Sequence, residues 1–213
     1  LVATPIGNLA DLSLRGLEIL QNAEVIACED TRVTGKMLSR HAIDTPMKAY
    51  HEHNAERARP GLLRIIEAGG VVALVSDAGT PSISDPGYRL VNDCIDQGLE
   101  ITAAPGANAA ITGLILSGLP TDRFLFAGFL PSKTSQRSKE LAELAAVPAT
   151  LIFYESAKRL AAALTDMVAE LGDRSAAVTR ELTKLHEEIR RGTLSELAQH
   201  YQDAGAPKGE IVI

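Results

Sequence analysis

The densest group of residues able to bind a small molecule is residues 76–87, which read SDAGTPSISDPG. The segment is longer and richer in glycine, proline and hydroxyl side chains than a plain connection requires. Glycine lets backbone approach a ligand closely, and Asp77, directly after an apolar run, can accept hydrogen bonds from ribose hydroxyls or an ammonium group. We therefore expect a ligand-binding loop. The alternative is a capped turn in which Asp85 and Pro86 begin the next helix.

Three further loops also follow short apolar runs: residues 4–9 (TPIGNL), 29–32 (EDTR) and 105–108 (PGAN). In open α/β sheets, ligands bind beyond the carboxyl ends of the strands. Residues 4–9 match neither a GxGxxG motif nor a P-loop, since Gly7 stands alone, and a plain strand-to-helix turn accounts for them equally well. We expect all four loops to lie at one edge of a sheet.

Residues 51–54 (HEHN) follow another apolar run. His51 and His53 are two residues apart and would share a strand face, which suits a metal ion, but no third ligand is evident. We therefore expect no metal site. The two imidazoles can bind substrate or accept a proton at a cleft edge, or they are exposed loop histidines.

Two basic clusters could contact phosphate groups. Arg32, Lys36 and Arg40 are spaced at i, i+4 and i+8, which places three positive charges on one helical face. This face could bind phosphate groups, or it could simply be exposed to solvent. The second cluster follows residues 128–131 (GFLP) and consists of Lys133, Arg137 and Lys139. A third charged segment, residues 179–188, carries both signs and favours a surface ion-pair network.

Short apolar runs alternate with longer amphipathic segments, and these elements must position the loops. The expected strands are residues 1–3, 25–28, 47–50, 71–75 and 100–103, and the expected helices are residues 13–22, 31–41, 54–68, 88–97 and 107–117. This βα repeat predicts a mostly parallel sheet with helices on both faces.

Residues 118–122 (GLPTD) form a breaker cluster, and we place a domain boundary there, giving domains 1–118 and 119–213. The second domain is expected to contain strands at 124–126, 150–154, 176–179, 187–191 and 210–213, and helices at 135–145, 159–171 and 194–203. The chain stops within the last of these strands, so we expect this domain to be truncated at its C-terminal end.

The composition is that of an ordinary globular protein. The 213 residues include 21 Lys and Arg and 27 Asp and Glu, a net charge of −6, and 46% of them are hydrophobic. Cys28 and Cys94 lack a CxxC pattern, which argues against a disulfide framework or structural zinc and favours a reducing cytosol. No apolar run approaches the roughly 18 residues of a membrane span.

Taken together, residues 4–9, 29–32, 50–54, 76–87, 128–131 and 180–184 resemble the ribosomal RNA small-subunit methyltransferase I family of the tetrapyrrole-methylase-like superfamily. The resemblance covers the whole chain in order. It implies methylation of a cytidine ribose 2′-hydroxyl in small-subunit (16S) ribosomal RNA with S-adenosylmethionine as cofactor. It further implies a cytoplasmic homodimer of two-domain α/β subunits, a parallel N-terminal and a mixed C-terminal sheet, the cofactor in the cleft between domains, and a helical tail beyond Ile213.

Carried over by position, the resemblance also assigns a cofactor pocket that draws on both halves of the chain. Its residues are Ile6, Gly7, Ser76, Asp77, Ala78, Gly79, Ile83, Asn108, Ala109, Tyr154 and Leu182.

Methyl transfer to a ribose hydroxyl requires alignment of the hydroxyl and a base that takes its proton. The candidate bases are Glu29, Asp30, His51 and Glu181. We expect Arg32, Arg180 and Lys184 to hold phosphate or to lower the pKa of the hydroxyl. The RNA track would be supplied by Lys36, Arg40, Lys133, Arg137 and Lys139.

Two alternatives remain open at this point. A methylase of the same fold could act on a tetrapyrrole of the precorrin type or, as diphthine-type enzymes do, on a modified histidine of a translation factor, because fold does not decide substrate. A non-catalytic ribosome-assembly factor could keep the fold and bind RNA without turnover.

Overall fold

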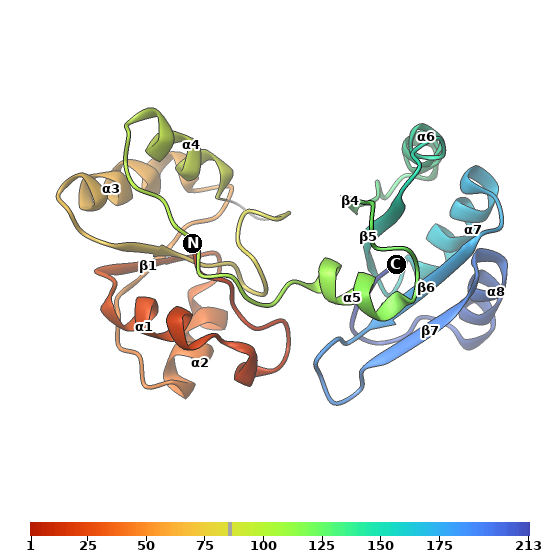
Figure 1. Cartoon of the computed structure of the whole chain (residues 1–213), viewed down its shortest axis with the longest axis horizontal. Helices are drawn as coiled ribbons and strands as arrows, with labels where there is room; N and C mark the ends of the chain where they lie inside the picture. Colours follow the sequence, from red (N-terminus) through yellow and green to blue (C-terminus); the bar gives the residue numbers. More distant parts are fainter. Residues whose placement is uncertain (85–86) are drawn as a thin grey trace. The chain divides into compact units, whose positions relative to one another are not determined.

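The computed structural model describes residues 1–84 and 87–213 and divides the chain into two compact units, Leu1–Asn108 (unit 1) and Ala109–Ile213 (unit 2) (Figure 1). Each unit combines helices with a sheet and has its own buried apolar core. Asp85 and Pro86, considered above as the start of a helix, lie outside the described residues.

The sheet of unit 1 is parallel, as predicted. Its strand order is β2 (Met47–Ala49), β1 (Val25–Cys28) and β3 (Val72–Leu74). The expected strands at 1–3 and 100–103 are reduced to an isolated parallel bridge between Val2 and Ala104. The Val2 N–H donates to the Leu74 carbonyl at 2.9 Å, so this bridge continues the sheet beyond β3.

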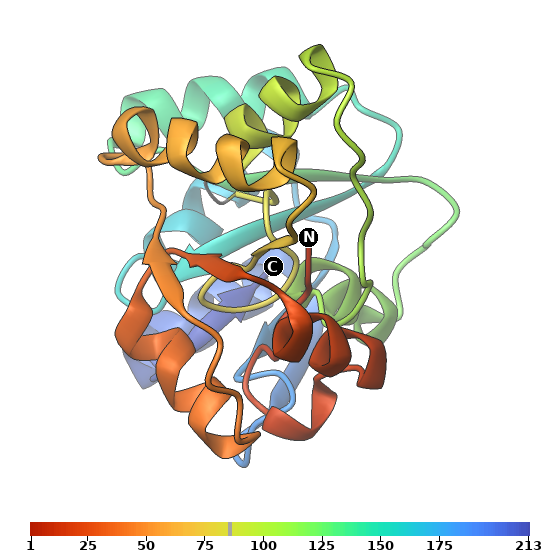
Figure 2. The same ribbon diagram turned by 90° about the vertical axis from the view of Figure 1, so that its left-hand side faces the viewer.

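Helices cover both faces of this sheet (Figure 2). On one face α1 (Leu14–Asn22) and α2 (Thr31–Arg40) pack against Ile26 and Cys28. On the other, α3 (Ala55–Glu67) and α4 (Tyr88–Asp96) pack against Val25 and Ala27. Successive side chains of β1 therefore enter opposite cores, and the strand is buried throughout because it lies between two helix layers. A short 3-10 helix, Leu9–Asp11, precedes α1.

The sheet of unit 2 is mixed, also as predicted. Its order is β4 (Phe124–Phe129), β5 (Thr150–Ser156), β8 (Glu210–Val212), β6 (Ser175–Arg180) and β7 (Glu188–Thr193). Strands β4 and β5 are parallel, and the remaining pairs are antiparallel. The carboxyl ends of β4 and β5 consequently lie at the same edge.

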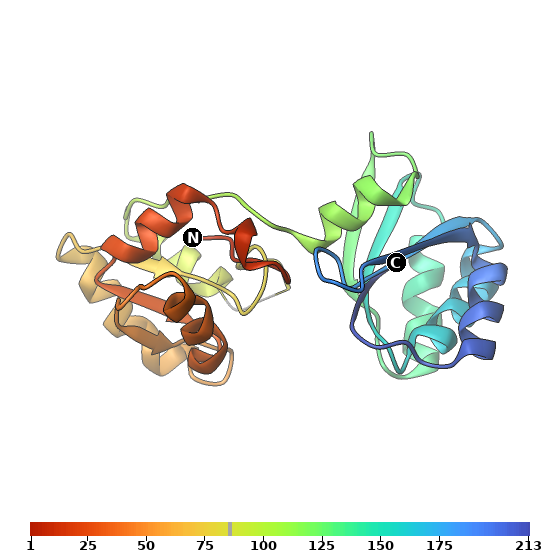
Figure 3. The same cartoon turned by 90° about the horizontal axis from the view of Figure 1, so that it is seen from below.

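Three helices cover one face of this sheet: α6 (Thr134–Leu144), α7 (Leu160–Leu171) and α8 (Leu194–Ala204) (Figures 1 and 3). Helix α5 (Ala109–Ser117) packs on β5, β6, β7 and β8. A Cβ atom on Gly113 would lie 3.0 Å from Thr179 Oγ1 and from Val212 Cγ1, so glycine permits this close approach. Because α5 packs on this sheet, the structure divides the chain before α5, ten residues ahead of the boundary that the breaker cluster suggested.

Both cysteines are free and buried, Cys28 in β1 and Cys94 in α4. Among the helices in the part of the chain that the structure describes, none is both long and apolar enough to cross a membrane.

Candidate active site

The loops predicted to meet at one edge of the unit 1 sheet are joined there by hydrogen bonds. The Thr4 N–H donates to the Gly79 carbonyl at 2.8 Å, and the Gly79 N–H donates to the Thr4 carbonyl at 3.0 Å. The Thr80 hydroxyl donates to the Ala107 carbonyl at 3.1 Å. Residues 4–9, the described part of 76–87 and residues 105–108 therefore form one continuous loop surface, which confirms this juxtaposition.

The fourth loop joins the same surface through its acidic residues. The Asp30 N–H donates to Asp77 Oδ1 at 3.0 Å. Asp30 also caps helix α2, because its Oδ1 accepts from the Arg32 N–H at 2.8 Å. Its carboxylate further pairs with the Arg32 guanidinium, so hydrogen bonds from Arg32 lower the pKa of Asp30 to about 2. Asp30 is therefore a weak base.

Glu29 differs from its neighbour in its affinity for protons. Burial raises the pKa of Glu29, and the nearby charges of Asp77 and Asp30 raise it further, while His51 opposes them. A carboxylate with a raised pKa holds a proton more readily, which is the property that a general base needs. Among the predicted bases with a shifted pKa, Glu29 alone is shifted in this direction.

Glu29 also lines an open cavity of about 410 Å³ in unit 1. The other lining residues are Tyr50, Glu52, Ala55, Ser84, Gly87, Tyr88 and Arg89. The cavity joins the end of β1 to the start of α4, and it combines two carboxylates with an exposed tyrosine and an exposed arginine. It is large enough and polar enough to admit part of a nucleotide.

A partly buried group of polar and charged side chains at this cavity was not predicted from the sequence. Tyr50 is only 1% exposed; burial raises the pKa of its hydroxyl, and a hydrogen bond from Arg59 opposes the shift. Arg59 in turn pairs with Asp93 at 2.5 Å. Tyr50 directly follows β2, whereas Arg59 and Asp93 come from α3 and α4, so no local spacing could have indicated that the three residues meet.

His51 lies in a turn rather than on a strand, because β2 ends at Ala49. The Asn54 side chain shapes this turn: its Oδ1 accepts from the His51 N–H at 2.9 Å, and its Nδ2 donates to the Ala49 carbonyl at 3.0 Å. The expected shared strand face with His53 is therefore wrong, although the two rings lie 6.1 Å apart edge to face. Among the described residues no group of three or more metal-binding side chains occurs.

The predicted cofactor residues of unit 1 cluster on the loop surface. Gly79 has a φ of +84°, which glycine adopts without strain, and a Cβ there would lie 3.3 Å from Ile6 Cγ2. The Ser76 hydroxyl donates to the Ala78 carbonyl at 3.2 Å. Ser82, which sequence reasoning did not single out, has a φ of +70° and a buried hydroxyl with no hydrogen-bond partner. The remaining predicted residues on these loops are Gly7, Asp77, Ile83 and Asn108.

In unit 2 the charged segment forms an ion-pair network. Arg180 donates to Glu188 Oε2 at 2.8 Å from Nη2 and to the Lys208 carbonyl at 2.9 Å. Lys184 Nζ lies 2.7 Å from carboxylate oxygens of both Glu181 and Glu210. These contacts match the alternative interpretation of residues 179–188 as an ion-pair network.

The same network makes Glu181 a poor proton acceptor. The hydrogen bond from Lys184 lowers the pKa of Glu181 despite partial burial, with smaller contributions from the Glu210 N–H and the Arg180 charge. Glu181 has a φ of +50°, and a Cβ on Gly209 would collide with its side chain, so Gly209 makes room for it. Of the other residues of unit 2 predicted to bind cofactor, Leu182 is buried, and Ala109 and Tyr154 are half-buried.

The two basic clusters differ in the structure. Helix α2 buries Thr34, Met37 and Leu38, so Arg32, Lys36 and Arg40 share its exposed side as predicted. In the second cluster, Lys133 and Lys139 are exposed.

Arg137, the remaining member of the second cluster, is only 4% exposed. Its guanidinium pairs with Asp166 at 2.6 Å and donates to the carbonyls of Pro131 and Ser132 and to the Thr134 hydroxyl. The prediction that Arg137 contacts RNA is therefore wrong, because its guanidinium is buried and already paired with the Asp166 carboxylate.

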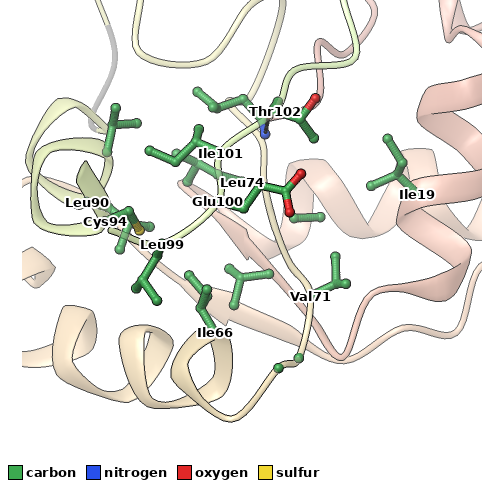
Figure 4. Close-up of a pocket in the computed structure, with 16 residues that line it drawn as sticks. Ile19, Ile66, Val71, Leu74, Leu90, Cys94, Leu99, Glu100, Ile101 and Thr102 are labelled. Atoms are coloured by element: carbon green, nitrogen blue, oxygen red, sulfur yellow. Dashed lines mark hydrogen bonds between the residues drawn. The ribbon is translucent and has the colours of Figure 1, made fainter. Parts of the chain in front are cut away.

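A second cavity in unit 1, of about 440 Å³, is lined mainly by apolar side chains (Figure 4). Gly70 and Val71 of its lining directly precede β3, whereas the loop surface follows the end of β3. Glu100 is the one acidic or basic side chain among its described lining residues, so this cavity has fewer charged groups than the cavity that Glu29 lines.

Comparisons with known proteins agree with these features. Residues 1–198 match the family described as Tetrapyrrole (Corrin/Porphyrin) Methylases. A protein of Mesorhizobium japonicum named ribosomal RNA small subunit methyltransferase I is 58% identical over 100% of this chain and 73% of its own length. Proteins of the same name from Halalkalibacterium halodurans and Escherichia coli O157:H7 are 50% and 47% identical, again over 100% of this chain and over 73% and 75% of their own lengths.

Solved structures show the same fold at low sequence identity. A cobalt precorrin-4 methyltransferase has a TM-score of 0.72 at 17% identity and covers 99% of this chain and 92% of its own. A diphthine synthase has a TM-score of 0.71 at 16% identity, covering 100% and 88%. At such low sequence identity these structures show only that the fold is shared. The relatives of 47–58% identity show the family. The chain accordingly belongs to the tetrapyrrole methylase family and, within it, to the ribosomal RNA small-subunit methyltransferase I family.

Proposed function

We propose that this protein methylates the ribose 2′-hydroxyl of a cytidine in small-subunit ribosomal RNA, with S-adenosylmethionine as methyl donor. The observation that carries the proposal is the 58% identity, over the whole chain, to a relative named ribosomal RNA small subunit methyltransferase I. The loop surface of unit 1, with an acidic group beside it, supports a methyl-transfer site. Cytidine and the 2′-oxygen are the finer part of the proposal and come from the family resemblance.

The residues of the loop surface fit the proposed cofactor. Bound S-adenosylmethionine supplies a methyl group on a positively charged sulfur, and it also carries an ammonium group and ribose hydroxyls. The carboxylate of Asp77 gives this region a negative potential that suits such a cation. The buried Ser82 hydroxyl, which has no hydrogen-bond partner in the structure, can form a hydrogen bond to the cofactor. Gly79 has no side chain, so its backbone can approach the cofactor closely.

Glu29 is the base that we propose for the ribose hydroxyl. Its raised pKa distinguishes it from Asp30 and Glu181, whose pKa values are lowered by ion pairs. It lines the 410 Å³ cavity, so a nucleotide there would bring a hydroxyl to its carboxylate. His51, whose charge interacts with Glu29, is proposed to position the carboxylate. For Tyr154 and Leu182, in unit 2, contact with cofactor stays a prediction.

The substrate RNA is proposed to contact the exposed face of α2, formed by Arg32, Lys36 and Arg40, together with Lys133 and Lys139 of unit 2. The resemblance further suggests a cytoplasmic homodimer that acts on naked RNA or on the assembled small subunit. Each of these partner assignments is separate from the assignment of the reaction.

The test is transfer of labelled methyl from S-adenosylmethionine to small ribosomal subunits from cells that lack this protein, followed by nuclease digestion to locate the label. Label on a 2′-O-methylcytidine supports the proposal in full. Label on another RNA position keeps the RNA substrate but rejects the cytidine 2′-oxygen. Unlabelled RNA with bound cofactor rejects the proposal and favours a tetrapyrrole or protein substrate.

The control for this assay is a carboxylate of unit 1 that lies away from the loop surface. Glu100→Gln removes a charge at the apolar cavity, and it should leave methyl transfer unchanged. Glu29→Gln removes a charge of the same kind and should abolish most of the transfer. Binding of RNA by the unmodified protein, without methyl transfer to RNA, tetrapyrrole or protein, would instead indicate a non-catalytic assembly factor.

A further inference from the structure

Three aromatic side chains gather at the end of the edge strand of unit 2. The Phe126 ring lies 4.8 Å from that of Tyr154, and the Phe129 ring lies 5.5 Å from it, both edge to face. Phe129 is 59% exposed even though it sits in a strand that is paired along its length with β5. The Phe129 ring is therefore supported by Tyr154 and exposed over more than half of its surface.

A β-bulge creates this cluster. The pairing register of β4 on β5 shifts between Phe126 and Gly128, and Gly128 has a φ of +70°. In a regular strand, residues three apart point to opposite faces of the sheet. The extra residue places Phe126 and Phe129 on the same face, against Tyr154, and bulges that re-aim a side chain in this way occur next to functional sites.

The loop that follows Phe129 is fixed by two guanidinium groups. Arg159 donates to the Leu130 carbonyl at 3.1 Å while it pairs with the buried Glu155 at 2.7 Å. Arg137 donates to the carbonyls of Pro131 and Ser132, as described above. Phe129 is therefore exposed at the end of β4, directly before a connection that these hydrogen bonds hold in place.

Exposed cations lie on the two loops at this edge. Lys133 follows β4 and Lys158 follows β5, and both are exposed. Lys133 is the N-cap of α6 but makes no side-chain capping bond, and its charge opposes the positive end of the helix dipole. Local stability does not explain a lysine here, whereas an anion bound at the helix start does.

We propose that Phe129 stacks on an unpaired base of the substrate RNA and that Lys133 and Lys158 contact the adjoining phosphates. Exposed aromatic rings beside cations are the usual means by which proteins hold single-stranded nucleic acid, since every base has a π face. The inference rests on the proposed function, because it assumes an RNA substrate. It adds a binding site in unit 2 for nucleotides other than the one that is methylated.

The test measures two affinities for each variant of the full chain. Binding of RNA is followed with a single-stranded oligonucleotide of about 12 nucleotides carrying 2-aminopurine, a base whose fluorescence falls on stacking, and binding of S-adenosylmethionine is measured by calorimetry. Phe129→Ala should weaken RNA binding by about 5- to 100-fold and restore the fluorescence. Phe129→Leu, which keeps apolar volume but no ring, should behave likewise, and Phe129→Trp should retain binding.

The matched control is Phe124→Ala at the opposite end of the same strand, where the ring is 43% exposed. It should leave RNA affinity unchanged. Equal RNA affinity of the Phe129→Ala and unmodified proteins overturns the stacking site, and so does an equal loss of cofactor affinity, which would assign the ring to the cofactor. If the unmodified protein neither binds nor methylates RNA, the proposed function fails as well, and the two failures are thereby distinguished.

Discussion

At the scale of single residues, the candidate bases differ in what surrounds each side chain. Asp30 and Glu181 are tied to Arg32 and Lys184, and these ion pairs hold their carboxylates in the charged state. Glu29 instead lies half-buried beside the Asp77 carboxylate, which disfavours its charge. A side chain whose pKa is shifted by burial and by a neighbouring charge of the same sign is common at functional sites.

Replacing Glu29 by glutamine should therefore separate activity from stability. Methyl transfer should fall by about 10²- to 10⁴-fold, the usual contribution of a general base, while affinity for S-adenosylmethionine should change little. Steady-state transfer to small ribosomal subunits and calorimetric titration of the cofactor measure these two quantities. A variant that keeps full activity would exclude Glu29 as the base.

The same substitution makes a prediction about pH. The pKa of Glu29 is raised in the folded chain above its ordinary value of 4.5, so its favourable contribution is complete below that pH and is lost as pH rises through the folded-state pKa. Glutamine never ionises and avoids this loss. The Tm of Glu29→Gln should thus exceed that of the unmodified protein at pH 7, and the two should converge below about pH 4.5. A lower Tm at pH 7 would contradict the assigned direction.

At the scale of elements, α6 shows a conflict between local stability and charge. Lys133 occupies a position that serine, threonine, aspartate or asparagine fills better. Replacing Lys133 by serine should stabilise unit 2 by about 1 kcal/mol through a new capping bond, while it weakens RNA binding. Urea denaturation and the fluorescent oligonucleotide measure the two effects. Lys139→Ser, within the same helix, is the control for stability and should bring no gain.

The turn before β8 shows how one glycine positions a charged pair. Gly209 has a φ of +105°, and a Cβ there would meet the Glu181 side chain. Gly209→Ala should cost about 1–3 kcal/mol in the free energy of unfolding and disturb the contact between Glu181 and Lys184. Gly205→Ala is the control, since Gly205 also has a positive φ but nothing lies within 4 Å of its Cβ position. Equal costs for the two variants would show that the collision with Glu181 is unimportant.

The bounds of the helices and strands could be predicted from the sequence where local signals determine them. Helix α2 was expected at 31–41 and is found at Thr31–Arg40, because apolar spacing and the Asp30 cap are local signals. The burial of Arg137 depends on Asp166, twenty-nine residues later, and the bulge at Gly128 depends on pairing with β5. Contacts of this kind are tertiary, and neither leaves a trace in local spacing.

For the whole molecule, the sequence again predicted the features that depend on local patterns and missed one that depends on tertiary packing. Two α/β units and the meeting of four loops in unit 1 followed from alternating apolar runs and from the rule that ligands bind at strand ends. Helix α5 was assigned to the first domain because a breaker cluster follows it. Its packing on the second sheet depends on tertiary contacts, such as the close approach of Gly113 to Thr179 and Val212.

The net charge of −6 raises the question of how such a chain would bind a polyanion. If binding depends on the local face of α2, then Lys36→Glu with Arg40→Glu should weaken RNA binding and flatten its salt dependence. Each lost phosphate contact with a single strand reduces the slope of log K against log salt by about 0.7, so two should reduce it by about 1.4. Titration of the oligonucleotide at several salt concentrations gives this slope.

The decisive control has the same net charge in a different place. Arg57 and Arg64 are exposed on α3, which covers the opposite face of the unit 1 sheet from α2. Each reversal to glutamate lowers the charge by two, so both double variants carry −10 in place of −6. If total charge governed binding, the two would lose affinity equally. The α2 face is the RNA contact only if Lys36→Glu with Arg40→Glu flattens the slope and Arg57→Glu with Arg64→Glu leaves it near that of the unmodified chain, because released counterions report the phosphates actually contacted.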